Sequence, residues 1–364
     1  MKAFLTIVLI LMLAAAAAAG YLWYSIEKPF GTIPSEGIFV EIPHGASRRA
    51  AAYILQQHGI IRNSIAFEIY ARRHPKRSLL AGEYFFDHPL TGKEVFWKLA
   101  NGDVYQQPFT VKEGDTIFDI AHNLDAEHYM KAAEFLNAAN DATQIQDFVP
   151  GAKTLEGFLF PATYKLPRHE SPADLTAMMV RKFREALQRI APDRLDPLTP
   201  GTQMLSVVTL ASLVEAETPK SDERPLVAGV YSNRLRKRML LQCDPTVIYA
   251  LKQVDKYNPP LLLKDLRYDS PYNTYVHGGL PPGPIGNPGE TAIRAAFAPA
   301  PTDYLYFVAN TQGGHFFAAT LAEHNKNVAK YHRLLNGEPA DPPVVEALRH
   351  HTAGSAHKGK KGKR

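Results

Sequence analysis

Cysteine is almost absent from this sequence, because Cys243 is the only one among 364 residues. One cysteine cannot form an intrachain disulfide or supply the cluster that a structural zinc site needs. The histidines are scattered, so we expect no metal site. Neither a G-x-S-x-G motif nor a glycine-rich phosphate loop stands out. Cys243 lies in an apolar segment that we expect to be a strand, and free cysteines in such places are usually inert.

A basic surface outside the C-terminal tail is also lacking. The formal net charge of +5 is supplied by five residues of the tail, Lys358, Lys360, Lys361, Lys363 and Arg364. The rest of the chain is therefore neutral overall, which argues against a nucleic-acid-binding fold, and we expect no nucleic-acid partner. Residues 337–364 are polar and rich in Pro, His and Lys, and we predict a disordered basic tail there.

One long apolar run is present, and it lies at the N-terminus. Residues 3–24 are apolar except for Thr6, and about 20 apolar residues span a bilayer as a helix. The run ends in aromatic residues that suit the membrane interface, Tyr21, Trp23 and Tyr24. A cleaved signal peptide is the alternative, because the run Ala14–Ala19 offers small residues for cleavage. We favour an uncleaved anchor. With either an anchor or a cleaved signal peptide, the rest of the chain is expected to be exported.

We expect about two to three domains beyond the anchor, all of the α+β class. The predicted parts are residues 1–25 (cytoplasmic stub and transmembrane anchor), 26–105 (a small α+β domain on the membrane side), 106–154, 155–336 and the tail 337–364. Within 106–154, the run PFTVKEGDTIFDIAHNLD predicts a strand, a turn at Gly114–Asp115 and a helix from Thr116. This opening resembles the first half of the LysM module, which binds peptidoglycan. The alternative is a capped turn without a ligand.

The segment Gln203–Tyr249 contains the most informative pattern. It begins with QMLSVVTLASLVEAETP, an apolar helix that Pro219 ends, so that Glu215 and Glu217 fall in its last turn. Burial and the negative end of the helix dipole both favour a protonated carboxyl group, which is what a general acid needs. The two glutamates point about 200° apart around the helix, so one of them faces a given cleft. The alternative is two solvated glutamates at a frayed helix end.

The loop of residues 269–288 is long and rich in proline and glycine. Loops of this length in compact domains are usually functional or disordered. Its run Tyr272, Asn273, Thr274 and Tyr275 offers rings and polar groups that suit sugar binding. A rigid surface loop without a ligand is the alternative.

Several motifs together resemble the MltG (YceG-like) family of endolytic murein lytic transglycosylases. They are AGEYFF, LEGFLFPATY, ASLVEAET, ER-x-x-VAGVYSNRL, LQCDPTVIYA, YNTY, GLPPGPIGNPG and YLYFVAN followed by GGHFFAAT. They occur in the family's order between residues 81 and 334, and the lysine-rich tail is the part that departs from the family. The resemblance implies a single-pass protein of the inner (cytoplasmic) membrane with an α+β catalytic domain on the periplasmic side.

The family's E-x-E motif implies that Glu217 is the catalytic residue. The implied reaction cleaves the β-1,4 bond between N-acetylmuramic acid and N-acetylglucosamine within a glycan strand and leaves a 1,6-anhydro end. One glutamate would act first as acid and then as base, and no cofactor is implied. Such an enzyme would act in wall assembly, terminating nascent strands, with peptidoglycan as substrate and cell-wall synthases (penicillin-binding proteins) as partners.

The remaining candidate residues are expected to contact the sugars or support the site. They are Glu215, Asn233, Gln242, Asp244, Tyr272, Asn273, Thr274 and Tyr275. Two other functions stay open. One is a muramidase that hydrolyses the bond with water, using Asp244 or Glu215 as a second carboxylate. The other is a non-catalytic, membrane-tethered wall-binding module that recruits synthases.

Overall fold

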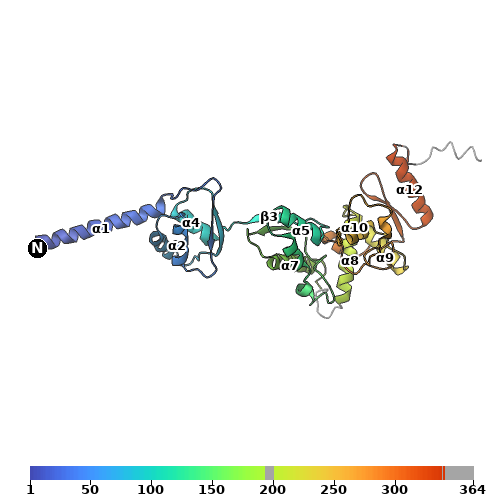
Figure 1. Ribbon diagram of the computed structural model, residues 1–364, viewed down its shortest axis with the longest axis horizontal. Helices are drawn as coiled ribbons and strands as arrows, with labels where there is room; N and C mark the ends of the chain where they lie inside the picture. Colours follow the sequence, from blue (N-terminus) through green and yellow to red (C-terminus); the bar gives the residue numbers. More distant parts are fainter. Residues whose placement is uncertain (193–200, 338, 341–364) are drawn as a thin grey trace, which may run out of the picture. The chain divides into compact units, whose positions relative to one another are not determined.

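The computed structural model describes residues 1–192, 201–337 and 339–340, which fold as two compact units (Figure 1). The first unit comprises residues 1–109 and 164–170, and the second comprises residues 110–163 together with those described from Ser171 onward. Nearly all of the predicted basic tail, 337–364, lies outside the described residues. The molecule is of the mixed α and β class.

The first unit begins with helix α1 (Lys2–Glu27), which is long and apolar enough to cross a membrane. At about 1.5 Å per residue, its 26 residues extend roughly 39 Å, more than the hydrocarbon thickness of a bilayer. Most of its apolar side chains are exposed, and Ser25 and Ile26 near its end are buried against the rest of the unit. An exposed apolar helix of this length has the character that the sequence predicts for a membrane anchor.

The rest of the first unit is a two-stranded sheet covered by three helices. Its elements are β1 (Ile38–Ile42), α2 (Arg48–Gln57), α3 (Ser64–Arg72), β2 (Gly82–Phe86) and α4 (Gly92–Asn101). The strands are antiparallel, with Val40 opposite Tyr84, and both of these side chains are fully buried. Helix α4 begins in a capping box between Thr91 and Glu94 and ends at Gly102, whose φ of 69° only glycine adopts readily.

Strands β3 (Gln107–Thr110) and β4 (Thr163–Leu166) cross the division, and three of the four residues of each belong to the first unit. The α-helices and the other strands of the second unit are α5 (Ile117–Ala126), α6 (Ala132–Ala139), α7 (Pro172–Ile190), α8 (Gly201–Glu217), α9 (Arg224–Arg236), α10 (Asp244–Lys252), α11 (Glu290–Phe297), β5 (Tyr306–Ala309), β6 (His315–Ala318) and α12 (Leu321–Leu335). Strand β3 pairs with β4, and β5 pairs with β6 as an antiparallel hairpin. Helix α8 packs against α9, α10 and α11, and every residue from Val208 to Val214 is buried. The stretch from Val208 to Val214 is therefore enclosed on all sides, as its apolar sequence predicts, whereas Ser206 and Ala216 are exposed.

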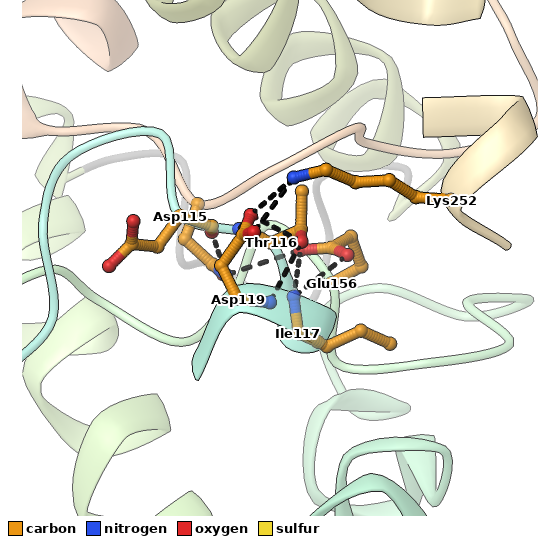
Figure 2. A network of polar contacts seen from close by, with 7 residues as sticks. Asp115, Thr116, Ile117, Asp119, Glu156 and Lys252 are labelled. Atoms are coloured by element: carbon orange, nitrogen blue, oxygen red, sulfur yellow. Dashed lines mark hydrogen bonds and ion pairs between the residues drawn. The ribbon is translucent and has the colours of Figure 1, made fainter. Parts of the chain in front are cut away.

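A polar network joins the start of α5 to the neighbouring elements (Figure 2). The Ile117 amide donates to both carboxyl oxygens of Glu156, at 3.2 and 3.1 Å. Thr116 and Asp119 form a capping box, and Asp119 also accepts from Lys252 Nζ of α10 at 2.7 Å. Residues 110–163 thus share one unit with the elements that follow, whereas the sequence analysis separates 106–154 as a domain. The strand–turn–helix of its LysM-like opening is present, and the resemblance to LysM stays a prediction.

The network predicts an unusual pH dependence of stability. Glu156 is 1% exposed, and burial raises its pKa to about 8, against the opposing effect of the Ile117 amide and the Tyr249 hydroxyl. Folding therefore keeps a proton on this carboxyl group that the unfolded chain releases near pH 4.5. The free energy of unfolding should fall as pH rises between these two values, by at most about 1.4 kcal/mol per pH unit for one group.

We predict that Glu156→Gln removes this decrease in the free energy of unfolding at rising pH, because glutamine resembles the protonated acid and does not titrate. The melting temperature of wild type and variant should be measured from pH 5 to pH 8.5, with Glu185→Gln on the exposed face of α7 as control. The variant should become the more stable protein toward pH 8, and the control should follow wild type. Parallel curves for wild type and Glu156→Gln would contradict the prediction.

Candidate active site

The last turn of α8 contains both glutamates of the E-x-E motif, as the sequence predicts. Glu215 is buried and Glu217 is half-buried, and the helix ends at Glu217, two residues before Pro219. The backbone carbonyls at this end of the helix carry partial negative charge, which disfavours ionised carboxyl groups. The two side chains enter different surroundings.

Glu217 is held by two donors from other elements. The hydroxyl of Tyr231 on α9 donates to Glu217 Oε2 at 3.0 Å, and the thiol of Cys243, just before α10, donates to the same oxygen at 3.5 Å. Both donor side chains are buried. Oε1 accepts no hydrogen bond from the residues that the structure describes, so it is the oxygen available to carry a proton and to meet a ligand.

The surroundings favour the protonated form of Glu217. Burial is the main cause that raises its pKa, and the nearby Asp244 adds to this shift, whereas Tyr231, Cys243 and His315 oppose it. Burial also raises the pKa of the Cys243 thiol and that of the Tyr231 hydroxyl. Both groups therefore remain protonated near neutral pH and act as donors.

Glu217 opens into a cavity of about 340 Å³, within the size range of small-molecule sites. The cavity is lined by Glu217, Arg234, Leu241, Gln242, Asp244, Tyr275, Phe307 and His324. Four predicted site residues thus meet in one place, namely Glu217, Gln242, Asp244 and Tyr275. The Tyr275 hydroxyl donates to Asp244 Oδ1 at 2.5 Å, which fixes the second carboxylate of the cavity.

The segment before Cys243 forms a loop, and the expected strand there is wrong. Gln242 has a φ of 52°, in the left-handed region that is uncommon for residues other than glycine. Its amide donates to the Thr274 carbonyl at 3.1 Å, and the next amide, that of Cys243, donates to Thr274 Oγ1 at 2.9 Å. Side-chain and loop partners take the place of a neighbouring strand, and this bend brings Gln242 to the cavity.

Three residues of the predicted sugar-binding run lie outside the cavity lining. Asn273 and Thr274 are fully buried. The Asn273 side-chain amide donates to the carbonyls of Leu266 and Tyr268, and the ring of Tyr272 packs on Tyr249 with centroids 4.9 Å apart. These residues hold the loop in shape and so position Tyr275.

The second half of the 269–288 loop is buried in the unit. The Ile285 amide donates to Ser212 Oγ of α8 at 3.0 Å, and the Leu159 amide donates to Asn287 Oδ1 at 2.9 Å. The Asn287 side-chain amide in turn donates to the Asp115 carbonyl and to Glu156 Oε1. This half of the loop therefore joins α8 to the segment before α5.

Two more candidates occupy other environments. Glu215 forms an ion pair with Arg224, both side chains being 5% exposed, and its Oε2 accepts from the Gly289 amide at 2.9 Å. Asn233 donates to the carbonyls of Thr302 and Tyr304 and borders a separate surface hollow beside α9. The structure thus brings neither residue to the cavity of Glu217.

Several residues of the site are not marked by any pattern in the sequence. Tyr231 and Arg234 lie in the VAGVYSNRL motif, whose spacing alone does not indicate which side chains face α8. Cys243 is expected from its apolar segment to be inert, whereas its thiol donates a hydrogen bond to Glu217 in the structure. His324 and Phe307 come from the C-terminal helix and hairpin, and no local pattern marks them.

The buried contact between Glu215 and Arg224 predicts a large effect on stability. Arg224→Met should lower the free energy of unfolding by about 3–5 kcal/mol, because it leaves a buried carboxyl group without its cation. Adding Glu215→Leu should restore part of the loss, since it removes the unpaired acid. Urea unfolding of wild type, both single variants and the double variant would measure the coupling. Strictly additive losses would show that the pair is not energetically coupled.

Comparison with known proteins gives one consistent family. The profile of the YceG-like family matches residues 40–330. The chain is 33% identical over 322 residues to an endolytic murein transglycosylase of Bacillus subtilis, an alignment that covers 84% of this chain and 88% of that protein. It is 30% identical over 364 residues to a Streptococcus pneumoniae protein of the same name, covering 91% of this chain and 65% of that protein.

A solved structure agrees with these sequence matches. The crystal structure of a yceG-like protein from Listeria monocytogenes is similar to this fold with a TM-score of 0.53 and 34% sequence identity. The superposition covers 80% of this chain and 99% of the Listeria chain. The profile match, the relatives and the shared fold all extend over most of the chain, which therefore belongs to the YceG-like family.

Proposed function

We propose that the chain is an endolytic peptidoglycan lytic transglycosylase and that Glu217 is its catalytic acid and base. The observation that carries the proposal is the setting of Glu217: a carboxyl group with a raised pKa, held through Oε2 by Tyr231 and Cys243, at the wall of a polar cavity. The names of the Bacillus and Streptococcus relatives support the substrate and the class of reaction.

The first step is protonation of the leaving group. Glu217 donates the proton on Oε1 to the oxygen that links C1 of N-acetylmuramic acid to the next sugar, and the C1–O bond breaks. Positive charge develops at C1, and the new carboxylate of Glu217 stabilises it. The donors on Oε2 keep the carboxyl plane fixed during this change, so little reorganisation is needed.

The second step returns the proton. The carboxylate of Glu217 takes the proton from the C6 hydroxyl of the same muramic acid, and O6 bonds to C1 to close the 1,6-anhydro ring. Glu217 is then neutral again, and no water is consumed. Ordinary glycosidases need two carboxyl groups, whereas here one residue serves both steps because the nucleophile belongs to the substrate.

Hydrolysis is the second candidate reaction, because Asp244 lines the same cavity as Glu217. A second carboxylate could activate water, as in inverting glycosidases. The short hydrogen bond from Tyr275 to Asp244 engages this carboxylate, which favours a role in holding the substrate. Mass spectrometry of the products separates the two reactions, since hydrolysis gives a reducing muramic end and the proposed reaction gives an anhydro end.

We further propose that α1 anchors the protein in the cytoplasmic membrane with the second unit on the periplasmic side. In that position Glu217 would reach glycan strands as they leave the membrane-bound synthases, which we propose as partners, and each cut would terminate a strand. The LysM-like residues 106–154, of which 110–154 belong to the same unit as the cavity, would add glycan contacts.

We predict that Glu217→Gln folds normally and loses nearly all cleavage. Glutamine keeps the shape of the neutral acid but cannot transfer the proton, and general acid–base catalysis contributes about 10²–10⁴-fold, with a residue that serves both steps at the upper end. The assay is release of anhydro-muropeptides from isolated sacculi, with circular dichroism as the folding check and Glu185→Gln as the control. A folded Glu217→Gln protein with wild-type release would overturn the mechanism.

The donors on Oε2 predict a shift of the pH profile. Activity should fall as pH rises through the pKa of Glu217, because the acid form is lost. Hydrogen bonds to the carboxylate lower this pKa, so Tyr231→Phe should raise it and move the alkaline limb of the profile to higher pH. Rates measured across that limb for wild type and Tyr231→Phe test this. An unchanged or acid-shifted limb would exclude Tyr231 as a donor to Glu217.

A further inference from the structure

Two arginines are buried among the described residues, and they differ in their partners. Arg224 is 4% exposed and forms ion pairs with Glu113 and Glu215. Arg234 is 8% exposed and forms no ion pair within the described part of the chain. Buried charges are normally paired, because an unpaired one loses the stabilisation of water. The setting of Arg234 therefore requires an explanation.

The hydrogen bonds of Arg234 leave one part of its guanidinium group free. Its Nε donates to the Leu305 carbonyl at 2.7 Å, and its Nη1 donates to the Leu241 and Leu240 carbonyls at 2.9 and 3.2 Å and to Gln242 Oε1 at 3.4 Å. An arginine has five N–H donors, and the two on Nη2 have no acceptor among the residues described. The side chain lines the cavity of Glu217.

The neighbours of Arg234 hold its orientation and do not neutralise it. Its guanidinium carbon lies 5.3 Å from the ring centroid of Tyr306, on which His324 stacks. Burial and the charge of Arg234 lower the pKa of His324, so the histidine is neutral near pH 7. The nearby carboxylate of Asp244 is already bonded to Tyr275. Arg234 is thus a fixed positive charge with a planar pair of donors left over.

We propose that Arg234 binds the lactyl carboxyl group of the N-acetylmuramic acid whose C1 reacts. This inference rests on the proposed function. Both sugars that alternate in the strand carry an acetamido group, and only muramic acid carries in addition a lactyl group, attached through O3 of the ring that contains C1. The group is a carboxylate in strands that have lost their peptides and an amide carbonyl in strands that retain them, and either form offers oxygen acceptors to Nη2.

The contact would determine which glycosidic bond is cut. With Glu217 and Arg234 on the wall of one cavity, a ring that meets both places its own C1 and C6 hydroxyl at the catalytic glutamate. N-acetylglucosamine in the same position would offer the Nη2 donors only its neutral O3 hydroxyl in place of the lactyl group, which is a weaker contact. The cut therefore falls on the C1 side of muramic acid and not on the alternate bond of the strand.

The test uses ligands, so it does not depend on altering Arg234. Full-length Glu217→Gln protein in detergent is titrated by calorimetry with three tetrasaccharides that differ only in the lactyl group: the carboxylate, the carboxamide and the reduced alcohol. Charge-assisted hydrogen bonds are the stronger ones, so the carboxylate should bind on the order of tenfold more tightly than the alcohol, with the carboxamide between them. Equal affinities for the carboxylate and the alcohol would overturn the inference and leave the proposed function standing. Absence of binding by all three would count against both.

Variants of the arginine give a second measurement. In the Glu217→Gln background, Arg234→Gln and Arg234→Lys should each reduce the difference among the three ligands, because neither residue offers a fixed pair of donors at this place. Lys237→Gln, an exposed position at the end of the same helix, should leave it unchanged. Melting temperatures show whether a variant has unfolded after losing the bonds from Arg234 to the backbone carbonyls. If both Arg234 variants unfold, the comparison of the three ligands on the Glu217→Gln protein is the test of the inference. A folded Arg234→Gln protein that keeps the full difference would refute the assignment.

Discussion

The ion pair between Glu215 and Arg224 fixes the end of α8, and the candidate site depends on it. Glu215 is held by Arg224 from α9 and by the Gly289 amide from the start of α11. Glu217 lies two positions after Glu215, so its side chain points about 200° away from that of Glu215 around the helix axis. Glu217 therefore points away from the ion pair and toward Tyr231 and Cys243. One glutamate holds the helix in place, and the other remains available for proton transfer.

The same elements also connect the site to the region before α5. Glu113 reaches Arg224, and Asn287 bonds to Asp115 and Glu156. A displacement of residues 110–163 would therefore disturb both the partner of Glu215 and the loop that leads to α11. This coupling explains physically why residues 110–163 and the elements around the candidate site form one unit, although the sequence suggests two separate domains.

The sequence was most informative where the pattern is local. The end of α8 follows from Pro219, and the helix starts follow from capping residues such as Thr91 and Thr116. The E-x-E motif and the geometry of a helix predict that Glu215 and Glu217 point into different surroundings. Local patterns could not reveal which side chains from α9, β5 and α12 close the cavity, because that depends on packing between elements far apart in the chain. The expected strand before Cys243 failed for the same reason, since loop and side-chain partners replaced a neighbouring strand.

The thiol of Cys243 is a weak donor to Glu217, and this weakness affects both the pKa and the orientation of the carboxyl group. A thiol is a poorer hydrogen-bond donor than a hydroxyl. Cys243 therefore restrains Oε2 but lowers the pKa of Glu217 only a little, so most of the increase that burial causes is kept. A second strong donor would favour the carboxylate and leave less of the acid form with which the proposed reaction begins. The single cysteine of the chain is thus a donor of intermediate effect: it restrains the carboxyl group of Glu217 and does not favour the ionised form strongly.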